Sequence, residues 1–207
     1  KFDINYNYLD ENKLLRSVSE KLSNGKIIGW FQGRSEFGPR ALGSRSILAD
    51  PRPIDMLKKL NLKIKYRESF RPFAPSILSE FQKEWFDSFN LNQYMSFVSK
   101  TRDFEIDKNE KFNGLKSLDH IKSKIKAVTH LDGTSRVQTV FKKLNPKFYG
   151  LIENFYKITG IPLIINTSFN VRGEPIVETP KDAIKCFLGT EMDYLIIDNF
   201  IICKTNQ

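Results

Sequence analysis

The chain has 207 residues, of which 40% are hydrophobic and seventeen are phenylalanine, so it has enough apolar material for a folded core and is not a disordered chain. Its formal net charge of +9 favours anionic partners but does not choose among them. No apolar run approaches the roughly 18 to 20 residues of a membrane helix, and the first residues, KFDINYNYLDENK, lack a signal-peptide core. We therefore expect a cytoplasmic protein with no membrane partner.

Helices and strands alternate in the first part of the chain. Residues 10–22 carry leucine and valine at helical spacing, with Asp10 as the expected N-cap and Asn24-Gly25 as the stop. Further expected elements are strands at 26–31 and 46–50, a helix at 53–64 and a strand at 71–78. Prolines interrupt that last run, RPFAPSIL, which favours an edge or interrupted strand.

The pattern weakens between residues 79 and 125 and returns after them. Residues 126–131 and 132–141 predict two short strands joined by a turn at Asp132-Gly133. Later expected elements are a helix at 146–158, a buried strand at 162–166, a helix at 181–189 behind an N-cap at Thr179, and two strands within 193–204. This alternation predicts a single α/β domain with a mixed sheet over residues 1–207, in which 1–25 form a lead-in helix.

Several familiar catalytic signatures are missing from the sequence. It has no G-x-x-x-x-G-K-[ST] phosphate loop, no strand-linked G-x-G-x-x-G and no serine elbow. Cys186 and Cys203 form no C-x-x-C pattern and are expected to be reduced thiols. His120 and His130 have no partner at metal-ligand spacing, so no protein metal site is expected.

Glycine and arginine are concentrated in the stretch GRSEFGPRALGSRS at residues 33–46. Glycine lets a ligand approach the backbone, and arginine binds anions in a bidentate manner. Arg40 and Arg45 are the candidate ligands. From these residues alone, the stretch is a phosphate cradle, a nucleic-acid arm or a solvated turn.

A second cationic cluster lies in KYRESFRPFAP. If this segment is extended, Lys65 and Arg67 share one face of it, and Arg71 adds a third positive charge. Two or three cations can then converge on one small anion. The alternative is a surface salt-bridge ladder with Glu68.

Two further clusters have polar side chains that alternate along an extended segment. Asn166, Ser168 and Asn170 follow a buried strand and can bind a ribose, an amide or a phosphate oxygen, or can simply cap the turn. Arg136 and Gln138 show the same alternation in DGTSRVQTV.

These clusters resemble a known family. Lys65-x-Arg67 followed by Ser168-x-Asn170 is similar to the KxR and SxN pattern of YrdC-like domains, which bind ATP and make acyl-adenylates. In the same order, four stretches resemble the carboxy-terminal domain of the nodulation-type O-carbamoyltransferases: GRSEFGPRALGSRSILADPR, KYRESFRPFAPSIL, HLDGTSRVQTV and NTSFNVRGEPIVETPKDAIKCF. The resemblance covers nearly all of the chain and implies a YrdC-like twisted open mixed sheet with flanking helices.

The resemblance also implies an activity and its partners. In that family this domain makes carbamoyl adenylate from carbamoyl phosphate and ATP, with Mg²⁺ carried by ATP. A separate amino-terminal metal-dependent domain of the same polypeptide then transfers the carbamoyl group to a hydroxyl acceptor, and nothing in this sequence resembles that domain. Matched positions assign carbamoyl phosphate to Lys65, Arg67 and Arg71, the nucleotide phosphates to Arg40, Arg45 and Arg136, and the ATP pocket to Asn166, Ser168 and Asn170.

The residue types suit this chemistry independently of the resemblance. Phosphoryl and nucleotidyl transfers are accelerated mainly by positioning and charge stabilisation, which needs neither histidine nor a nucleophilic serine. One alternative is a threonylcarbamoyl-adenylate synthase that uses threonine and bicarbonate. Another is an RNA-binding module, although cations in glycine and proline turns, rather than in a stripe with exposed aromatics, argue against nucleic acid.

Overall fold

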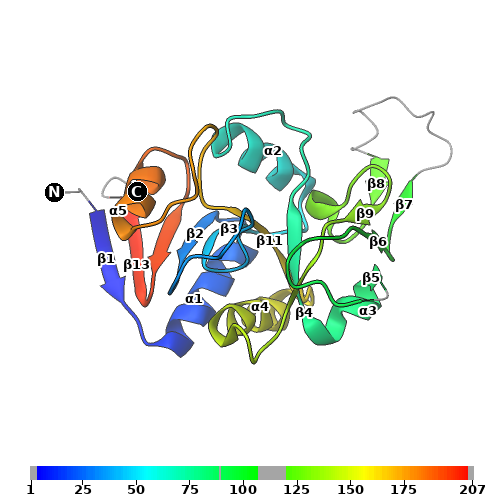
Figure 1. Cartoon of the computed structure of the whole chain (residues 1–207), viewed down its shortest axis with the longest axis horizontal. Helices are drawn as coiled ribbons and strands as arrows, with labels where there is room; N and C mark the ends of the chain where they lie inside the picture. Colours follow the sequence, from blue (N-terminus) through cyan, green and yellow to red (C-terminus); the bar gives the residue numbers. More distant parts are fainter. Residues whose placement is uncertain (1–3, 89, 107–119, 205–207) are drawn as a thin grey trace.

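The computed structural model describes residues 4–88, 90–106 and 120–204, which are built around an eight-stranded mixed sheet (Figure 1). The strand order is β1-β13-β12-β2-β3-β11-β4-β10, in which β12/β2 and β4/β10 are parallel pairs and the other neighbours are antiparallel. Its strands are β1 (Ile4–Tyr8), β2 (Ile28–Phe31), β3 (Arg45–Ala49), β4 (Ala74–Leu78), β10 (Gln138–Val140), β11 (Leu163–Ser168), β12 (Tyr194–Ile197) and β13 (Phe200–Lys204).

Helices cover the sheet, and two small sheets stand beside it. The helices are α1 (Glu11–Ser23), α2 (Ile54–Lys63), α3 (Gln82–Trp85), α4 (Pro146–Thr159) and α5 (Pro180–Leu188), with 3-10 turns η1 (Ser79–Phe81) and η3 (Lys126–Val128). The small sheets pair β5 (Phe86–Asp87), β6 (Ser99–Thr101) and β9 (Thr134–Ser135), and β7 (Glu105–Ile106) with β8 (Ile121–Lys122). No helix among the described residues is long and apolar enough to cross a membrane.

The main core lies between the sheet and its helices. Helices α1 and α4 pack together on one side of the sheet, and α2 and α5 lie on the other (Figure 1). Leu14, Val18 and Leu22 of α1 are fully buried, as their helical spacing predicts. Ser19 joins the two helices by donating a 2.9 Å hydrogen bond to the Leu151 carbonyl.

Most of the predicted elements are confirmed. The helices at α1, α2, α4 and α5 and the strands at β2, β3, β11, β12 and β13 lie within a few residues of their predicted bounds. Asp10 caps α1, accepting a hydrogen bond from the Lys13 amide at 3.0 Å. Thr179 caps α5 in a reciprocal capping box with Asp182.

Three predictions about elements need correction. Strand β4 is an interior strand, not an edge. Pro75 lies opposite Ile165 of β11, and pairing with β10 starts only at Ser76, so Pro75 does not have to donate a backbone hydrogen bond to β10. Residues Lys126–Val128 form a 3-10 turn rather than a strand. Residues 1–25 contain strand β1 as well as the predicted helix.

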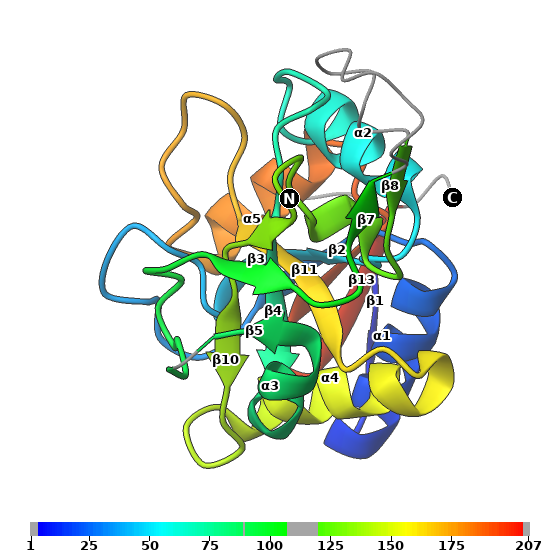
Figure 2. The ribbon, with the colours of Figure 1, turned by 90° about the vertical axis from the view of Figure 1, so that its right-hand side faces the viewer.

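Strand register brings several segments together at one end of the sheet. Asn166 of β11 pairs with Leu48 of β3 and Ala74 of β4, and the next β4 residues pair with β10 from Gln138 onward. The end of β11 therefore meets the starts of β3, β4 and β10. Figure 2 shows the loops that follow β2 and β11 reaching out on the same side of the molecule.

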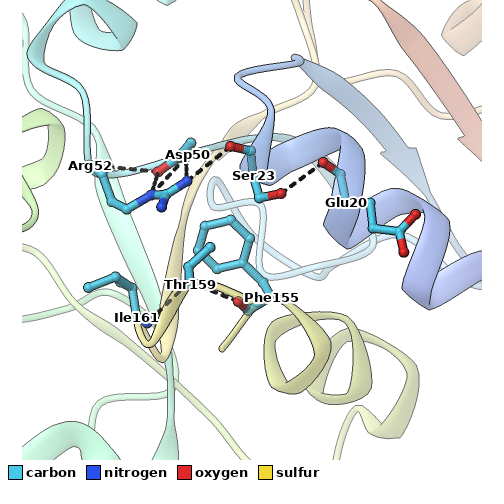
Figure 3. A network of polar contacts seen from close by, with 7 residues as sticks. All are labelled: Glu20, Ser23, Asp50, Arg52, Phe155, Thr159 and Ile161. Carbon is cyan, nitrogen blue, oxygen red and sulfur yellow. Dashed lines mark hydrogen bonds and ion pairs between the residues drawn. The ribbon is translucent and has the colours of Figure 1, made fainter. Parts of the chain in front are cut away.

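A buried ion pair fixes the opposite end of β3. Asp50 is 1% exposed, and its carboxylate accepts hydrogen bonds from the Arg52 guanidinium at 2.5 to 3.0 Å and from the Arg52 amide at 2.9 Å (Figure 3). Arg52 also donates to the Ser23 carbonyl at 3.0 Å and lies over the Phe155 ring. This pair ties the end of α1, the end of β3 and helix α4 to one another.

Replacing Asp50 with alanine should destabilise the protein by about 2 to 4 kcal/mol, because the half-buried Arg52 guanidinium loses its charged partner. Urea unfolding of Asp50→Ala measures this free energy. Glu191→Ala is the matched control, since its ion pair with Lys63 has both side chains at least half exposed and should contribute less than about 1 kcal/mol. Equal losses in the two variants would contradict the role given to the Asp50–Arg52 pair.

Candidate functional site

The amine of Lys65 is the most constrained group at this end of the sheet. Lys65 follows α2 and is only 4% exposed. Its Nζ donates to the carbonyls of Ser168 and Asn170 at 2.5 and 2.9 Å and to Asn170 Oδ1 at 2.9 Å, while Ser168 Oγ lies at 3.4 Å. The Ser168 hydroxyl in turn donates to Asn170 Oδ1 at 2.8 Å. The two predicted motifs, Lys65-x-Arg67 and Ser168-x-Asn170, therefore meet.

Burial also changes the acidity of this amine. Desolvation lowers the pKa of Lys65 to about 7, and the positive charge of Arg67 acts in the same direction. The carbonyl oxygens around Nζ act in the opposite direction, because they stabilise the ammonium form. An amine with a pKa near neutrality gains its proton readily when an anion binds beside it.

Two hollows adjoin each other above this lysine. The larger, a cleft of about 520 Å³, is lined by Arg40, Arg67, Arg71, Arg136 and Asn166 among others. The smaller, of about 320 Å³, is lined by Lys65, Arg67, Arg71, Ser168, Asn170 and Arg172 among others. Arg67, Arg71 and Ser168 line both, so we call the pair the joined hollows.

Burial and neighbouring positive charge lower the pKa of two arginines of the joined hollows. Burial lowers the pKa of Arg67 to about 10, with Arg71 contributing, and burial also lowers the pKa of Arg136, with Arg40 contributing. Glu68 is the single carboxylate among the lining residues of either hollow. A concave surface with this surplus of positive charge binds anions.

The prediction that Lys65 and Arg67 lie together is confirmed, but for a different reason from the one proposed. The segment is not extended, because Tyr66 between them has φ +47°, in the left-handed region. This turn directs both flanking side chains to the smaller hollow. Left-handed backbone in a bulky residue is strained and is common at functional sites.

Asn166 lies in the floor of the cleft and is 1% exposed. Its Nδ2 donates to Ala41 carbonyl, Ser76 Oγ and Gln138 Oε1 at 2.9 to 3.1 Å. Its Oδ1 has no hydrogen-bond partner within the described part of the chain. A buried acceptor left unsatisfied is costly, which favours a donor supplied by a small movement or by a ligand.

Of the residues assigned to the substrates by matched position, Arg45 alone does not line the joined hollows. Its guanidinium is buried against the Phe31 ring, 3.5 Å from the ring centroid, and donates to the carbonyls of Gln32 and Gly33 at 2.9 and 3.0 Å. Burial lowers its pKa. Arg45 therefore supports the base of the 33–46 loop, and the geometry gives no support to a phosphate contact.

Glu36 organises the same loop, and the sequence did not single it out. Its Oε1 accepts hydrogen bonds from the amides of Leu42 at 2.6 Å, Ser44 at 2.7 Å and Arg45 at 3.4 Å. Gly43 within this turn has φ +109°, and a Cβ there would lie 2.5 Å from the Phe148 ring, so only glycine fits. The carboxylate closes the loop that carries Arg40 to the cleft.

Comparison with known proteins gives one matching family. The family model described as Carbamoyltransferase C-terminus matches residues 19–204. Nodulation protein NolO of Bradyrhizobium diazoefficiens is 46% identical over 191 residues, which are 91% of this chain and 32% of that protein. The 3'-hydroxymethylcephem-O-carbamoyltransferase of Amycolatopsis lactamdurans is 34% identical over 167 residues, 81% of this chain and 28% of that enzyme. The chain thus spans about a third of the length of these relatives.

Solved structures share the fold at low sequence identity. Full-length HypF in its phosphate- and nucleotide-bound form superposes with a TM-score of 0.57 at 17% identity, covering 93% of this chain and 26% of that chain. P. abyssi Sua5 complexed with L-threonine gives a TM-score of 0.56 at 16% identity, covering 93% of this chain and 48% of that chain. These similarities confirm the predicted fold class, a YrdC-like mixed sheet with flanking helices.

The lowered pKa of Lys65 predicts a specific dependence of stability on pH. The unfolded lysine keeps its proton up to about pH 10.4, whereas the folded one loses it near pH 7, so between these values the unfolded state binds more protons. The free energy of unfolding should therefore rise between pH 7 and 10, by up to about 4 kcal/mol, relative to Lys65→Met. Urea titrations across this range, with Lys63→Met as the exposed control, measure it. Parallel profiles for the wild type and Lys65→Met would contradict the shift.

Removing the Glu36 carboxylate should destabilise the loop, because three partly buried amides lose their acceptor. We expect Glu36→Ala to cost about 1 to 3 kcal/mol in urea unfolding. Glu178→Ala is the control, since that carboxylate accepts only from the Ser35 hydroxyl among the hydrogen bonds of the described residues. A loss no greater than that of the control would exclude this role for Glu36.

Proposed function

We propose, from the premise that this chain belongs to the carbamoyltransferase C-terminal family, that it forms carbamoyl adenylate from carbamoyl phosphate and ATP. The family membership rests on the match over residues 19–204 and on the carbamoyltransferase relatives. The carbamoyl group would then pass to a hydroxyl of an acceptor.

The observation that carries this proposal is the meeting of Lys65 with Ser168 and Asn170 beneath a surface of arginines. A buried amine, held by three oxygens from the end of β11, lies next to Arg67 and Arg71. These are groups that neutralise phosphate and carbamate oxygens, and arginine adds bidentate geometry. The supply of fixed positive charge suits a reaction in which several anions must come together.

The two hollows suggest how the substrates are divided. In this proposal carbamoyl phosphate occupies the smaller hollow over Lys65, and the triphosphate of ATP lies in the larger cleft against Arg40 and Arg136. Arg67 and Arg71 line both hollows and would contact both substrates. Sharing these two residues would hold the carbamoyl group close to the α-phosphate of ATP.

The proposed reaction has two steps. Water adds to the carbonyl carbon of carbamoyl phosphate, the bond between that carbon and the bridging oxygen breaks, and inorganic phosphate leaves with the bonding electrons, so that carbamate forms and one proton is released to solvent. A carbamate oxygen then attacks the α-phosphorus of ATP, the bond between that phosphorus and the bridging oxygen breaks, and pyrophosphate leaves with the bonding electrons. Lys65, Arg67 and Arg71 would stabilise the carbamate, and Arg40 and Arg136 the departing pyrophosphate.

Magnesium is expected to enter bound to ATP and to neutralise its phosphates. The described residues contain no group of three or more His, Cys, Asp and Glu side chains that could hold a metal ion, so the proposal gives Mg²⁺ phosphate and water ligands. Asn166, Ser168 and Asn170 would line the nucleotide and adenylate pocket.

The proposed partner for the second half of the reaction is an amino-terminal carbamoyl-transfer domain of the same polypeptide. Its existence is supported by relatives about three times as long as this chain. Exposed apolar side chains near the cleft, Phe37 on the loop of Arg40 and Val98 on the cleft wall, are candidates for contact with it.

Carbamoyl phosphate should drive cleavage of ATP to AMP and pyrophosphate in this chain. Lys65→Met should lower that rate by at least about 100-fold, because the buried positive charge is lost. Pyrophosphate release and AMP formation are the measurements, with circular dichroism to confirm that the variant is folded. Lys63→Met, which changes an exposed lysine of the same region, should leave the rate unchanged.

Two further assays separate the competing functions. Threonine with bicarbonate in place of carbamoyl phosphate tests the alternative of a threonylcarbamoyl-adenylate synthase, and ATP cleavage only with that pair would replace the proposal. Salt-dependent binding of generic RNA that survives saturation with ATP would favour an RNA-binding module. ATP cleavage that continues unchanged in Lys65→Met would remove the role given to that residue.

A further inference from the structure

Asn61 lies behind the loop of residues 65–71, which carries Lys65, Arg67 and Arg71, and it lines neither of the joined hollows. It occupies the last turn of α2 and is fully buried, at 0% exposure. Asparagine is a poor residue for a helix interior, and a buried amide is costly unless all its groups are bonded. Its presence here therefore calls for a compensating set of contacts.

Those contacts all go to the loop that carries the cations. Asn61 Oδ1 accepts from Arg67 Nε at 2.7 Å, and Nδ2 donates to the carbonyls of Ser69 and Arg71 at 3.1 and 2.8 Å. The Asn61 backbone carbonyl accepts from the Arg67 amide at 3.0 Å. One buried side chain thus spans the loop from Arg67 to Arg71.

The contact with Arg67 also orients the guanidinium. Asn61 takes Nε, and the group lies over the Phe73 ring with its central carbon 5.0 Å from the centroid. Among the described residues, neither terminal nitrogen of Arg67 donates a hydrogen bond, and the Arg67 side chain lines both hollows. A guanidinium held by Nε and a ring presents its two terminal NH₂ groups together to an anion.

We propose that Asn61 is the positioning residue that sets Arg67 and Arg71 as a shared anion clamp between the two hollows. The identity of the anions rests on the proposed function, but the clamp itself requires only phosphate-like oxygens. Asn61 would act through Arg67 and through the loop, without touching the ligand.

The test measures binding of inorganic pyrophosphate by calorimetry to the 207-residue chain, without catalysis. Arg67→Ala should weaken binding about 10- to 100-fold, and Asn61→Ala about 10-fold. If Asn61 acts largely through Arg67, the double variant Asn61→Ala/Arg67→Ala should weaken binding by clearly less than the product of the two single losses, whereas independent effects would multiply. Asn154→Ala is the matched control, because that helical asparagine donates within its own helix, to the Gly150 carbonyl.

Arg67→Lys keeps the inference testable if Asn61→Ala does not fold. Lysine retains the charge but has no Nε–H for Asn61 and no fork, so binding should weaken about 10-fold. Multiplicative losses in the double variant, or wild-type affinity in Arg67→Lys, would overturn the clamp. If the variants weaken pyrophosphate binding as expected but the wild type shows no carbamoyl phosphate-driven ATP cleavage, the proposed function fails and the clamp stands.

Discussion

The buried amine of Lys65 is the constraint on which the architecture of the site depends. A lysine can be buried only where enough oxygens surround it, and here those oxygens come from Ser168, the last residue of β11, and from Asn170. Their positions are set by the pairing of β11 with β3 and β4. The Lys65 amine can therefore be buried only when both the core of the sheet and the end of α2 have folded.

Two groups of cations serve different ends in this protein. The terminal nitrogens of Arg45 are held by backbone carbonyls and its guanidinium lies on an aromatic ring, whereas Arg52 is paired with Asp50. The cations of the joined hollows face one another with a single lining carboxylate, so their repulsion lowers the stability of the empty protein. Sites that lower stability in this way are those at which a ligand can restore it.

The sequence predicted the site better than it predicted the contacts that support it. Lys65, Arg67, Ser168 and Asn170 could be found because their spacing resembles a known pattern, yet the turn at Tyr66 that joins the first two is invisible to an argument from alternation. Arg45 looked equivalent to Arg40 in the sequence. Only the tertiary packing shows that the Arg45 side chain is buried in the protein while Arg40 lines the cleft.

Several contacts and one strand could not be predicted from the sequence. Asn61 and Glu36 act through hydrogen bonds to backbone atoms, which no residue pattern reports. Strand β1, INYNY, has polar and aromatic residues that are mostly exposed, so it lacks the buried alternation that marks a strand. Pro75 suggested an edge strand because the sequence does not show that the β10 ladder starts one residue later.

The place of β11 in the sheet has a consequence for biosynthesis. Strands β3 and β4 are made early, but the strand that separates them is encoded more than eighty residues after β4 ends. Until β11 leaves the ribosome, both keep an unpaired apolar edge, which is a surface prone to mispairing and aggregation. The contacts of Lys65 with Ser168, at the end of β11, and with Asn170 span more than one hundred positions, and such distant pairings form slowly. A nascent chain stalled before residue 163 should therefore be a better chaperone client than the finished domain.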